Sequence, residues 1–580
     1  MKIEIPATRF IAVSLILGLL LIGFMPVMFN QSFVWDDELN ICQNSRMLAP
    51  DLEGICGFWT APYMNMYIPA TYTAWSAVSL AGQALGLHDS GGPLNAWLFH
   101  IINLFLHLIN GVLIFILLEK LVKNRFAACV GALFFALHPV QAEAVSYITE
   151  LKTLLAFAFS FLSINLYYSN RLKTENGEKV LGSHVLALAL FVLALLSKPV
   201  AVVVPFFLFV INLLIFNQDL RKNLQTTAPW FLIVIPFILL TKNVQPPYSF
   251  QFVPSFGQRI LLYGDAVAHY FYKAVFPWPL GLDYGRTPEK VLGQWWAYAA
   301  WIVPALVAGS LLLSGKRARP YLAGVLIFII GFGPVSGLVP FIFQTISTVA
   351  DRYMYFPMFG LGLTAAFLLS RHSKNLTKGI AIGVLILLAM GVNAQVRTWG
   401  DNLRLYTQGV KVNPRSAISY NNLAANYVHN SFEGVIYYHR ALTIKPDYLM
   451  AARNLCASVL FLRKEQPGVN LDLLIKPDKK AEADLFFRKA VEFAGAGDYA
   501  RSCLWMGKSM VINMFNSKIL NNYAVLSWKL NDFKTARPLL ELAADLAPDD
   551  PDIAKNLLLT LPGQDSSDTK AEDFIFFNTP

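Results

Sequence analysis

Charged residues are scarce in this 580-residue chain. Asp, Glu, Lys and Arg make up 14% of it, against 55% hydrophobic residues and a mean hydropathy of +0.47. A soluble protein of this composition would have to bury more apolar surface than globular cores accommodate. The composition therefore excludes an ordinary soluble protein and predicts an integral membrane protein.

The few charges are also unbalanced, because 47 Lys and Arg face 37 Asp and Glu, a net charge of +10. In a soluble protein such an excess would indicate a nucleic-acid partner. In a protein with many membrane spans it is typical of basic cytoplasmic loops. We therefore expect membrane lipid, and no nucleic acid, as a partner of this chain.

Cysteine is rare too, with five residues in the chain. Cys42 and Cys56 are the only two that one short exposed loop could bring together, so they are a disulfide candidate, with two free thiols as the alternative. The other three are expected to be small buried residues. No Gly-rich phosphate loop, Ser nucleophile elbow or Cys-x-x-Cys pair occurs in the sequence.

Long apolar runs are present as far as residue 395 or so and then stop. The first, 10–29, can span a hydrocarbon core of roughly 30 Å and has no small-residue cleavage site after it, which favours a retained helix over a cleaved signal peptide. Ten further segments follow, near residues 97–118, 126–144, 149–169, 181–197, 199–216, 228–241, 293–314, 321–340, 353–370 and 379–395.

The connections between these segments differ sharply in charge. Five of them are basic, each where an alternating path that starts inside returns to the cytoplasm, whereas the loop 30–67 is acidic. This predicts eleven spans with a cytoplasmic N-terminus and an outer C-terminal domain, and makes 258–276 re-entrant or interfacial. The basic clusters are Lys120, Lys123 and Arg125; Arg171, Lys173 and Lys179; Arg221 and Lys222; Lys316, Arg317 and Arg319; and Arg371, Lys374 and Lys378.

The part of the chain after the apolar runs contains a repeat. Asn-Asn-Leu-Ala at 421–424 recurs as Asn-Asn-Tyr-Ala at 521–524, and the turn signals at 497–499 and 531–533 lie 34 residues apart. A helix pair of this period resembles the tetratricopeptide repeat, whose stacked units share one core. We expect three or four units between about 404 and 555, which either recruit a peptide or protein or only brace the membrane part.

Three consecutive acids follow the first span at its outer end. Asp36, Asp37 and Glu38 stand directly behind Trp35, and a solvated loop start is the plain alternative for them. A carboxylate in this place can deprotonate an acceptor hydroxyl, which makes Asp36 and Asp37 the catalytic candidates. The same two residues are candidates for holding a divalent metal, Mg²⁺ or Mn²⁺.

A second outer segment, 138–152, is rich in polar residues between two apolar runs. Glu143, Ser146, Tyr147 and Glu150 fall at i, i+3, i+4 and i+7, so they form one polar stripe if the segment is helical. From this segment and its outer neighbours we take five candidates for substrate binding or support: Glu38, His138, Glu143, Asp351 and Tyr353.

Three cations at outer segment ends break the positive-inside trend. Lys152, Lys198 and Arg352 each stand next to a long apolar run. An anionic headgroup or a pyrophosphate-type ligand would explain cations on this side, and snorkelling or helix pairing is the alternative for each one singly. They are our candidates for binding the phosphate of a donor.

A further polar stripe runs along the second expected span. His100, Asn103, His107 and Asn110 follow i, i+3, i+7 and i+10. The stripe extends down the helix and contains no carboxylate, so interhelical hydrogen bonding is favoured over metal binding.

Taken together, these residues resemble a known family. The motifs are Val-Trp-Asp-Asp at 34–37, His-Pro-Val-Gln-Ala-Glu-Ala-Val at 138–145, Leu-Ser-Lys at 196–198, Asp-Arg-Tyr-Met-Tyr-Phe-Pro at 351–357, and Arg-Thr-Trp at 397–399 before the repeats. In this order, and over essentially the whole chain, they resemble the transmembrane and tetratricopeptide-repeat O-mannosyltransferases and their bacterial relatives. The resemblance implies an integral membrane glycosyltransferase of the GT-C class that uses a polyprenyl-phosphate sugar.

Carried over by position, the resemblance implies a catalytic-base or metal position at Asp36 and Asp37. It also implies that Glu143 lies by the donor phosphate or the acceptor and that Arg352 binds phosphate. The family more often has Glu where this chain has Asp351, and a basic residue near Leu151, where only Lys152 stands close. These departures concern the phosphate ligands and leave the class unchanged.

We therefore expect an all-α protein in three parts. Residues 1–396 form a GT-C type membrane domain of about eleven spans, 397–560 an extracytoplasmic tetratricopeptide-repeat α-solenoid, and 561–580 a disordered tail. The expected reaction passes a sugar from a polyprenyl-phosphate donor to a hydroxyl of protein Ser or Thr, outside a bacterial inner membrane. The alternatives are an envelope lipid or polysaccharide acceptor, or a non-catalytic scaffold that displays the repeats.

Overall fold

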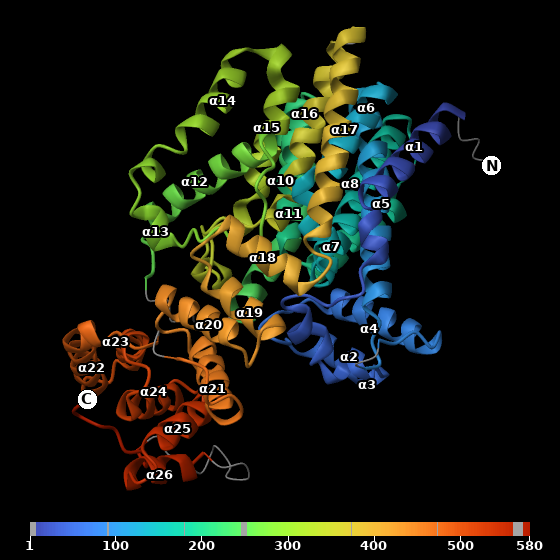
Figure 1. Cartoon of the computed structure of the whole chain (residues 1–580). Coiled ribbons are helices and arrows are strands. Elements are labelled where there is room, and N and C mark those ends of the chain that lie inside the picture. Colours follow the sequence, from blue (N-terminus) through green and yellow to red (C-terminus); the bar gives the residue numbers. More distant parts are fainter. Residues whose placement is uncertain are drawn as a thin grey trace. The chain divides into compact units, whose positions relative to one another are not determined.

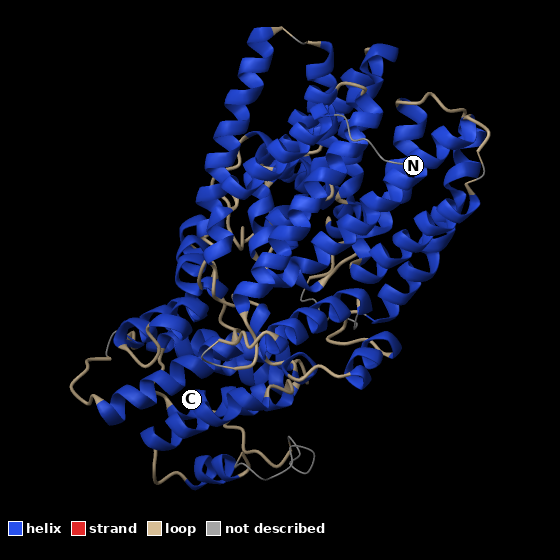
Figure 2. Cartoon of the chain, turned by 90° about the vertical axis from the view of Figure 1, so that its right-hand side faces the viewer, coloured by secondary structure: helices blue, strands red, loops and turns tan. Residues whose placement is uncertain are grey.

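The computed structural model describes residues 7–89, 92–178, 180–244, 252–372, 374–471, 474–560 and 572–580. All regular structure in these ranges is helical, apart from two isolated β-bridges, which confirms the all-α prediction (Figure 2). Contacts divide the chain into Met1–Leu405 and Tyr406–Pro580. The sequence predicted the end of the first domain at residue 396, a little before this division.

The first unit is a bundle of long apolar helices (Figure 1). Their ends carry local signals: the side chain of Asn95 caps α5, and Lys123 takes a left-handed conformation just before Asn124 caps α6. The α-helices are α1 (Ala7–Gly23), α2 (Ser45–Leu48), α3 (Leu52–Thr60), α4 (Pro69–Ala84), α5 (Ala96–Val122), α6 (Arg125–Ala136), α7 (Ala142–Ser146), α8 (Leu151–Glu175), α9 (Leu181–Ser197), α10 (Val204–Leu214), α11 (Leu220–Val244), α12 (Phe256–Val275), α13 (Pro288–Leu292), α14 (Ile302–Leu313), α15 (Arg319–Gly331), α16 (Met358–Arg371) and α17 (Asn375–Arg397).

Each of the eleven expected spans coincides with a helical segment of the described chain. By length and composition, six of these segments are long and apolar enough to cross a membrane, and the bent pair of α6 with Pro139–Ser146 makes a seventh. The other four, at α1, α9, Pro199–Leu214 and α16, are shorter apolar helices. The described chain thus supports a multi-pass membrane protein with six or seven clear candidate spans, fewer than predicted.

The segment expected to be re-entrant or interfacial forms α12, which is not among the candidate spans. The helix carries Arg259, Asp265 and Lys273, and its apolar residues gather on one face. A helix of this kind suits an interface or a protein surface better than a lipid-facing span.

The basic connections of the first unit lie at one end of the bundle. Arg9 at the start of α1 and Arg125 at the start of α6 both pair with Glu119 near the end of α5. The remaining connections are tied together by contacts of Arg171 with Gln218, Arg319 with Asn217, Arg371 with the carbonyl of Arg317, and Lys378 with the ring of Phe126. Lys179, which belongs to one predicted cluster, lies outside the described residues.

Small residues bring three helices of the bundle into close contact. A Cβ added at Gly131 of α6 would overlap the carbonyl of Gly362 in α16, and one added at Gly360 would overlap the carbonyl of Gly324 in α15. Because apolar helices in lipid gain little from the hydrophobic effect, such close backbone approach is a main source of their packing energy. Helix α16 therefore sits between α6 and α15 through its glycines.

The second unit consists of helical hairpins, as the repeat predicted. Asn531 turns the chain between α24 and α25 with a positive φ of 62°, and Gly497 does so between α22 and α23 with a φ of 76°, both at predicted turns. The helices are α18 (Asn402–Val412), which crosses the boundary, α19 (Ala417–Tyr427), α20 (Phe432–Ile444), α21 (Leu449–Glu465), α22 (Lys480–Gly495), α23 (Tyr499–Ile512), α24 (Ser517–Lys529), α25 (Phe533–Leu546) and α26 (Pro551–Leu558).

The disordered tail predicted over 561–580 is wrong for its last residues. Residues 561–571 lie outside the described chain, but Phe574 is buried in the core of the second unit. Backbone groups of Ile575 and Phe577 are hydrogen-bonded to asparagines of α24 and α26. The segment is ordered because its three Phe and one Ile can pack against the second unit. The acidic stretch before it was what led to the prediction of disorder.

The glycine contacts predict opposite effects for two Gly→Ala substitutions in neighbouring helices. At Gly360 the added methyl group meets backbone, including the amide nitrogen of Phe328 at 2.7 Å, whereas at Gly379 of α17 nothing lies within 4 Å. Gly360→Ala should destabilise the protein by about 1–3 kcal/mol, and Gly379→Ala should stabilise it by about 0.5–1 kcal/mol. Thermal unfolding of both variants in detergent checks this. Equal shifts of Tm relative to the unchanged protein would contradict the close contact of α16 with α15 at Gly360.

Candidate functional site

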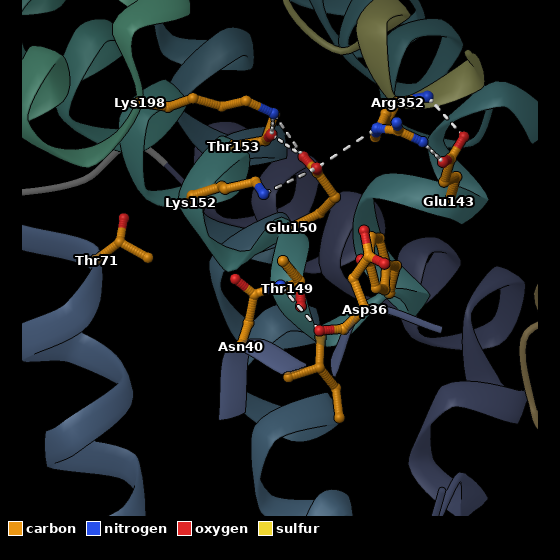
Figure 3. A network of polar contacts seen from close by, with 12 residues as sticks. Asp36, Asn40, Thr71, Glu143, Thr149, Glu150, Lys152, Thr153, Lys198 and Arg352 are labelled. Atoms are coloured by element: carbon orange, nitrogen blue, oxygen red, sulfur yellow. Dashed lines mark hydrogen bonds and ion pairs between the residues drawn. The ribbon is translucent and has the colours of Figure 1, made fainter. Parts of the chain in front are cut away.

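Four segments that are far apart in the sequence meet at one end of the first unit (Figure 3). They are the stretch after α1, the bend between α6 and α8, Lys198 after α9, and the 3₁₀ turn Asp351–Met354. Helix α8 starts at this end, and Arg171 lies 20 residues further along it, so roughly 30 Å of helix separates the meeting point from the basic connections. The site and the basic clusters thus occupy opposite ends of the bundle.

Glu150 is the centre of the charge network at this end. Its Oε2 lies 2.8 Å from Nζ of Lys198, and its Oε1 lies 3.8 Å from Nζ of Lys152 and 3.7 Å from Nε of Arg352. Thr153 donates a hydrogen bond to Glu150 and accepts one from Lys198 at 2.6 Å. The three cations predicted to bind phosphate therefore converge on one buried carboxylate.

Arg352 is held from two sides. Glu143 accepts hydrogen bonds from the Arg352 backbone amide, at 2.9 Å, and from its guanidinium. Rings surround the guanidinium carbon, with the centroids of Phe343 at 4.3 Å and Trp35 at 5.3 Å. Only 8% of the Arg352 side chain is exposed, so its charge acts over short distances in a medium of low polarity.

Asp36 lies beside this network and is half-buried (Figure 3). The side chain of Tyr147 lies next to it, and the ring of Tyr147 is stacked between Trp35 at 5.6 Å and Trp399 at 5.5 Å. Burial raises the pKa of Asp36, an effect that the positive charges of Lys152 and Arg352 oppose. Asp36 is thus a carboxylate with elevated proton affinity beside two cations of the network, Lys152 and Arg352.

Asp37, by contrast, is fully buried and occupied by the protein's own donors. Its Oδ1 accepts hydrogen bonds from the amide of Thr149 at 2.8 Å and from its hydroxyl at 2.6 Å, and its Oδ2 accepts one from the amide of Val34 at 3.0 Å. Burial raises its pKa to about 7. Asp37 fastens the loop after α1 to the start of α8, and in doing so it positions its neighbour Asp36.

Comparison with known proteins gives relatives of one kind. No family model matches the chain. A protein O-mannosyl-transferase of Caenorhabditis elegans is 26% identical over 374 residues, which cover 60% of this chain and 51% of that protein. Human protein O-mannosyl-transferase TMTC1 is 26% identical over 421 residues, 62% and 47% of the two chains, and mouse TMTC4 is 24% identical over 481 residues, 70% and 63%.

The chain is a relative of the TMTC protein O-mannosyl-transferases. It spans about half the length of the first two of these relatives. The predicted resemblance to this family is thereby confirmed.

Other predicted site residues of this O-mannosyl-transferase relative lie elsewhere. Glu38 is exposed, and its carboxylate faces the amide of Gln43 at 3.4 Å, away from the cations. His138 is fully buried: its Nδ1 accepts from the amide of Val140, and its Nε2 lies 3.1 Å from the carbonyl of Ala274. These contacts make His138 the cap of the 3₁₀ turn Pro139–Gln141, while the substrate-binding role predicted for Glu38 and His138 stays a prediction.

Asp351 and Tyr353 flank Arg352 and differ in what they contact. Asp351 is buried and accepts a hydrogen bond from the hydroxyl of Tyr284 at 2.7 Å. Burial, reinforced by the negative charge of Glu143, raises the pKa of Asp351. Tyr353 instead stays with the site, with its ring centroid 5.0 Å from the guanidinium carbon.

The polar stripe predicted for 143–150 is not one helical face. Helix α7 ends at Ser146, because Tyr147 takes an extended conformation with φ −84° and ψ 113° before a 3₁₀ turn leads into α8. Glu143 and Glu150 nevertheless reach the same arginine, from either side of this bend.

The stripe on α5 behaves as predicted, since His100, Asn103, His107 and Asn110 bond to groups of other segments.

The candidate disulfide is not formed, since Cys42 and Cys56 are both free. Cys42 ends a π-helical turn, Glu38–Cys42, and packs against a small apolar core, whereas Cys56 lies exposed on α3. Within the described ranges, no group of three or more His, Cys, Asp or Glu side chains is placed to hold a metal ion. Of the two residues predicted to hold a metal, Asp37 has both carboxylate oxygens hydrogen-bonded to Val34 and Thr149, and Asp36 is half-buried.

Several residues of the site were not among the predicted ones. Glu150 and Tyr147 appeared only as part of a stripe, and Thr149 and Thr153 were not selected at all. A signal did exist, because Glu150 and Lys152 are charged residues at the start of an apolar run and must therefore find partners. What the sequence did not show is that their partners are Lys198 and Arg352.

The network predicts a large stability loss on removing its central charge. Glu150→Gln removes the buried carboxylate on which Arg352 and the partly buried Lys152 and Lys198 converge, which should lower the free energy of unfolding by about 3–5 kcal/mol. The matched control is Glu175→Gln, which breaks the exposed Arg171–Glu175 pair and should cost about 0–1 kcal/mol. Thermal unfolding in detergent compares the two, and equal effects would show that Glu150 is not the centre of the network.

Proposed function

We propose that this chain is an integral membrane glycosyltransferase. It passes a sugar from a polyprenyl-phosphate-linked donor to a hydroxyl group of a protein, on the side of the membrane opposite the basic connections. The observation that carries the proposal is the half-buried Asp36 beside Lys152 and Arg352, which share the carboxylate of Glu150 with Lys198. The printed names of the relatives, protein O-mannosyl-transferases, agree with it.

The three cations account for the donor. They face two carboxylates, Glu143 and Glu150, which leaves a positive charge to attract a phosphate. Arg352 suits a phosphate because its planar guanidinium offers parallel donors, and Lys152 and Lys198 add mobile point charges. Together they stabilise the charge that develops on the phosphate as the bond to the sugar breaks.

Asp36 accounts for the acceptor. The acceptor hydroxyl oxygen attacks the anomeric carbon of the sugar, its proton passes to Asp36, and the donor phosphate leaves with the electron pair of the broken bond. The raised pKa of Asp36 suits a base that must take up a proton. The proposal thus narrows the two catalytic candidates to Asp36 and gives Asp37 a positioning role.

A divalent metal fits only in a restricted way. Asp36 is a single carboxylate, and Mg²⁺ held by one carboxylate takes further oxygens from substrate phosphates. Bound there, the metal would add positive charge at the leaving phosphate. Neither proton transfer to Asp36 nor phosphate binding by the three cations depends on it.

The membrane arrangement follows from the charge distribution. Gathered at one end of the bundle, the basic connections mark the cytoplasmic side by the positive-inside trend, with the N-terminus at that end. Counting the four shorter apolar helices as spans then gives the eleven spans of a GT-C type enzyme. In this proposal the helical hairpins of the second unit are tetratricopeptide repeats that recruit the acceptor.

The central test is transfer by the purified full-length protein. Given a polyprenyl-phosphate sugar, mannose first, and a Ser- and Thr-rich polypeptide, Asp36→Asn should lower kcat about a hundredfold or more. Glu38→Gln, two residues away and exposed, is the matched control and should retain activity. Unchanged transfer by Asp36→Asn would overturn the assignment of Asp36 as the general base. Transfer to envelope lipid or glycan alone would replace the acceptor class, and no transfer from any donor would favour a scaffold.

The pKa of Asp36 predicts the pH dependence. A base must be deprotonated, so kcat/KM should fall as the pH drops through the pKa of Asp36, which burial places above the usual carboxyl range. Since the charge of Lys152 lowers that pKa, Lys152→Met should move the acid limb to higher pH, and Lys152→Arg should leave it in place. An acid limb that Lys152→Met does not move would contradict the role of Asp36.

A further inference from the structure

Three asparagines of the second unit bind the backbone of the chain's own C-terminal segment. Asn522 donates to the carbonyl of Phe577 and accepts from its amide, both at 2.7 Å. Asn556 does the same for Ile575, at 2.7 and 2.8 Å, and Asn521 donates to the same Ile575 carbonyl at 2.9 Å. Each of the two bound residues therefore has both its backbone polar groups paired with asparagine amides.

The spacing of these contacts defines the bound conformation. Ile575 and Phe577 are alternate residues, and the stretch 575–577 is neither helix nor turn. In an extended chain, alternate residues present their backbone groups to the same side. Phe576, the residue between them, takes part in none of these contacts. The asparagines thus recognise an extended backbone, which every sequence without proline at the two bound positions can offer.

Side chains add an apolar anchor beside the backbone contacts. Phe574 is 7% exposed, and its ring centroid lies 5.0 Å from that of Trp528. Nζ of Lys518 lies 5.7 Å from the centroid of Phe577. This resembles strand addition, in which main-chain hydrogen bonds provide affinity and pockets for some side chains provide preference.

The same asparagine arrangement occurs a second time in this unit. Asn521 donates to Asn522 and accepts from Asn556. Likewise Asn421 donates to Asn422 at 2.9 Å and accepts from Asn454 at 3.1 Å. The recurrence of the Asn-Asn pair noted in the sequence is therefore a recurrence of a structural triad, of which the second binds the C-terminal segment.

We infer that Asn521, Asn522 and Asn556 form a binding site for an extended polypeptide, which residues 574–577 occupy as an internal ligand. An acceptor polypeptide in an extended conformation binds the same asparagines by displacing the segment. Naming the competitor as the acceptor rests on the proposed function, but the site itself does not. A C-terminal segment held in this way lowers the apparent affinity for other polypeptides.

The test uses a labelled peptide with the sequence of residues 572–580. Fluorescence anisotropy measures its affinity for the full-length protein in detergent. A chain that ends at Thr560 should bind the peptide about tenfold more tightly than the intact chain, because a tethered competitor acts at roughly millimolar effective concentration. Phe574→Asp in the intact chain removes the anchor without shortening the chain and should raise the affinity in the same direction. Equal affinities in all three proteins would overturn the proposal.

Two controls identify the groups that bind. In the chain ending at Thr560, the double variant Asn522→Ala with Asn556→Ala should lose peptide binding, whereas Asn422→Ala, the matching position of the first triad, should keep it. N-methylation of the peptide at the amide of Ile575 or Phe577 should abolish binding, and N-methylation at Phe576 should not. Loss of binding on methylation at Phe576 alone would contradict the alternate-residue contact.

Peptide binding needs no sugar donor, so this test is separate from the test of transfer. Binding of the peptide without any sugar transfer would support the peptide site and overturn the proposed enzymatic function. Transfer with no competition between the nonapeptide and the acceptor polypeptide would leave both the enzyme and the peptide site intact, and would overturn the identification of the acceptor as the ligand of that site.

Discussion

The first unit depends on one electrostatic constraint, the pairing of Glu150 at the end of an apolar bundle. A buried charge without a partner costs several kcal/mol, so the start of α8 cannot pack until cations reach it. Those cations come from the residue after α9, from the turn before α16 and from α8 itself. Pairing of Glu150 therefore holds together segments about 200 residues apart.

The distribution of charge also separates the two ends of the bundle. At one end, Lys and Arg of the connections are largely exposed or pair with single acids, as in Arg9 and Arg125 with Glu119. At the other end, Arg352 is buried among carboxylates and aromatic rings, and the partly buried Lys198 pairs with Glu150. Water and salt screen the charge of an exposed cation, whereas a buried cation interacts strongly with a ligand in contact with it. Only the second environment suits selective binding of a phosphate.

Much of the fold was predictable, because apolar length is a local property of the sequence. All eleven expected segments coincide with helices, and the turns at Gly497 and Asn531 lie where the repeat indicated. The site was less predictable because it depends on distant partners. Asp36 and Asp37 are neighbours of the same type, and what distinguishes their surroundings is chiefly the pair of hydrogen bonds that Asp37 accepts from Thr149, 112 residues away. The bend at Tyr147 likewise broke a stripe that assumed a continuous helix.

The two sites of the chain share one physical solution. Buried donors must be satisfied even before a ligand arrives. In the first unit, Glu143 and Glu150 supply acceptor oxygens to Arg352 and Lys198, which are the oxygens that a phosphate would supply. In the second, Ile575 and Phe577 supply backbone groups to Asn522 and Asn556, as an acceptor polypeptide would. In both proposals, binding is an exchange of partners, so the free protein stays stable and each ligand must match the geometry of the internal group that it replaces.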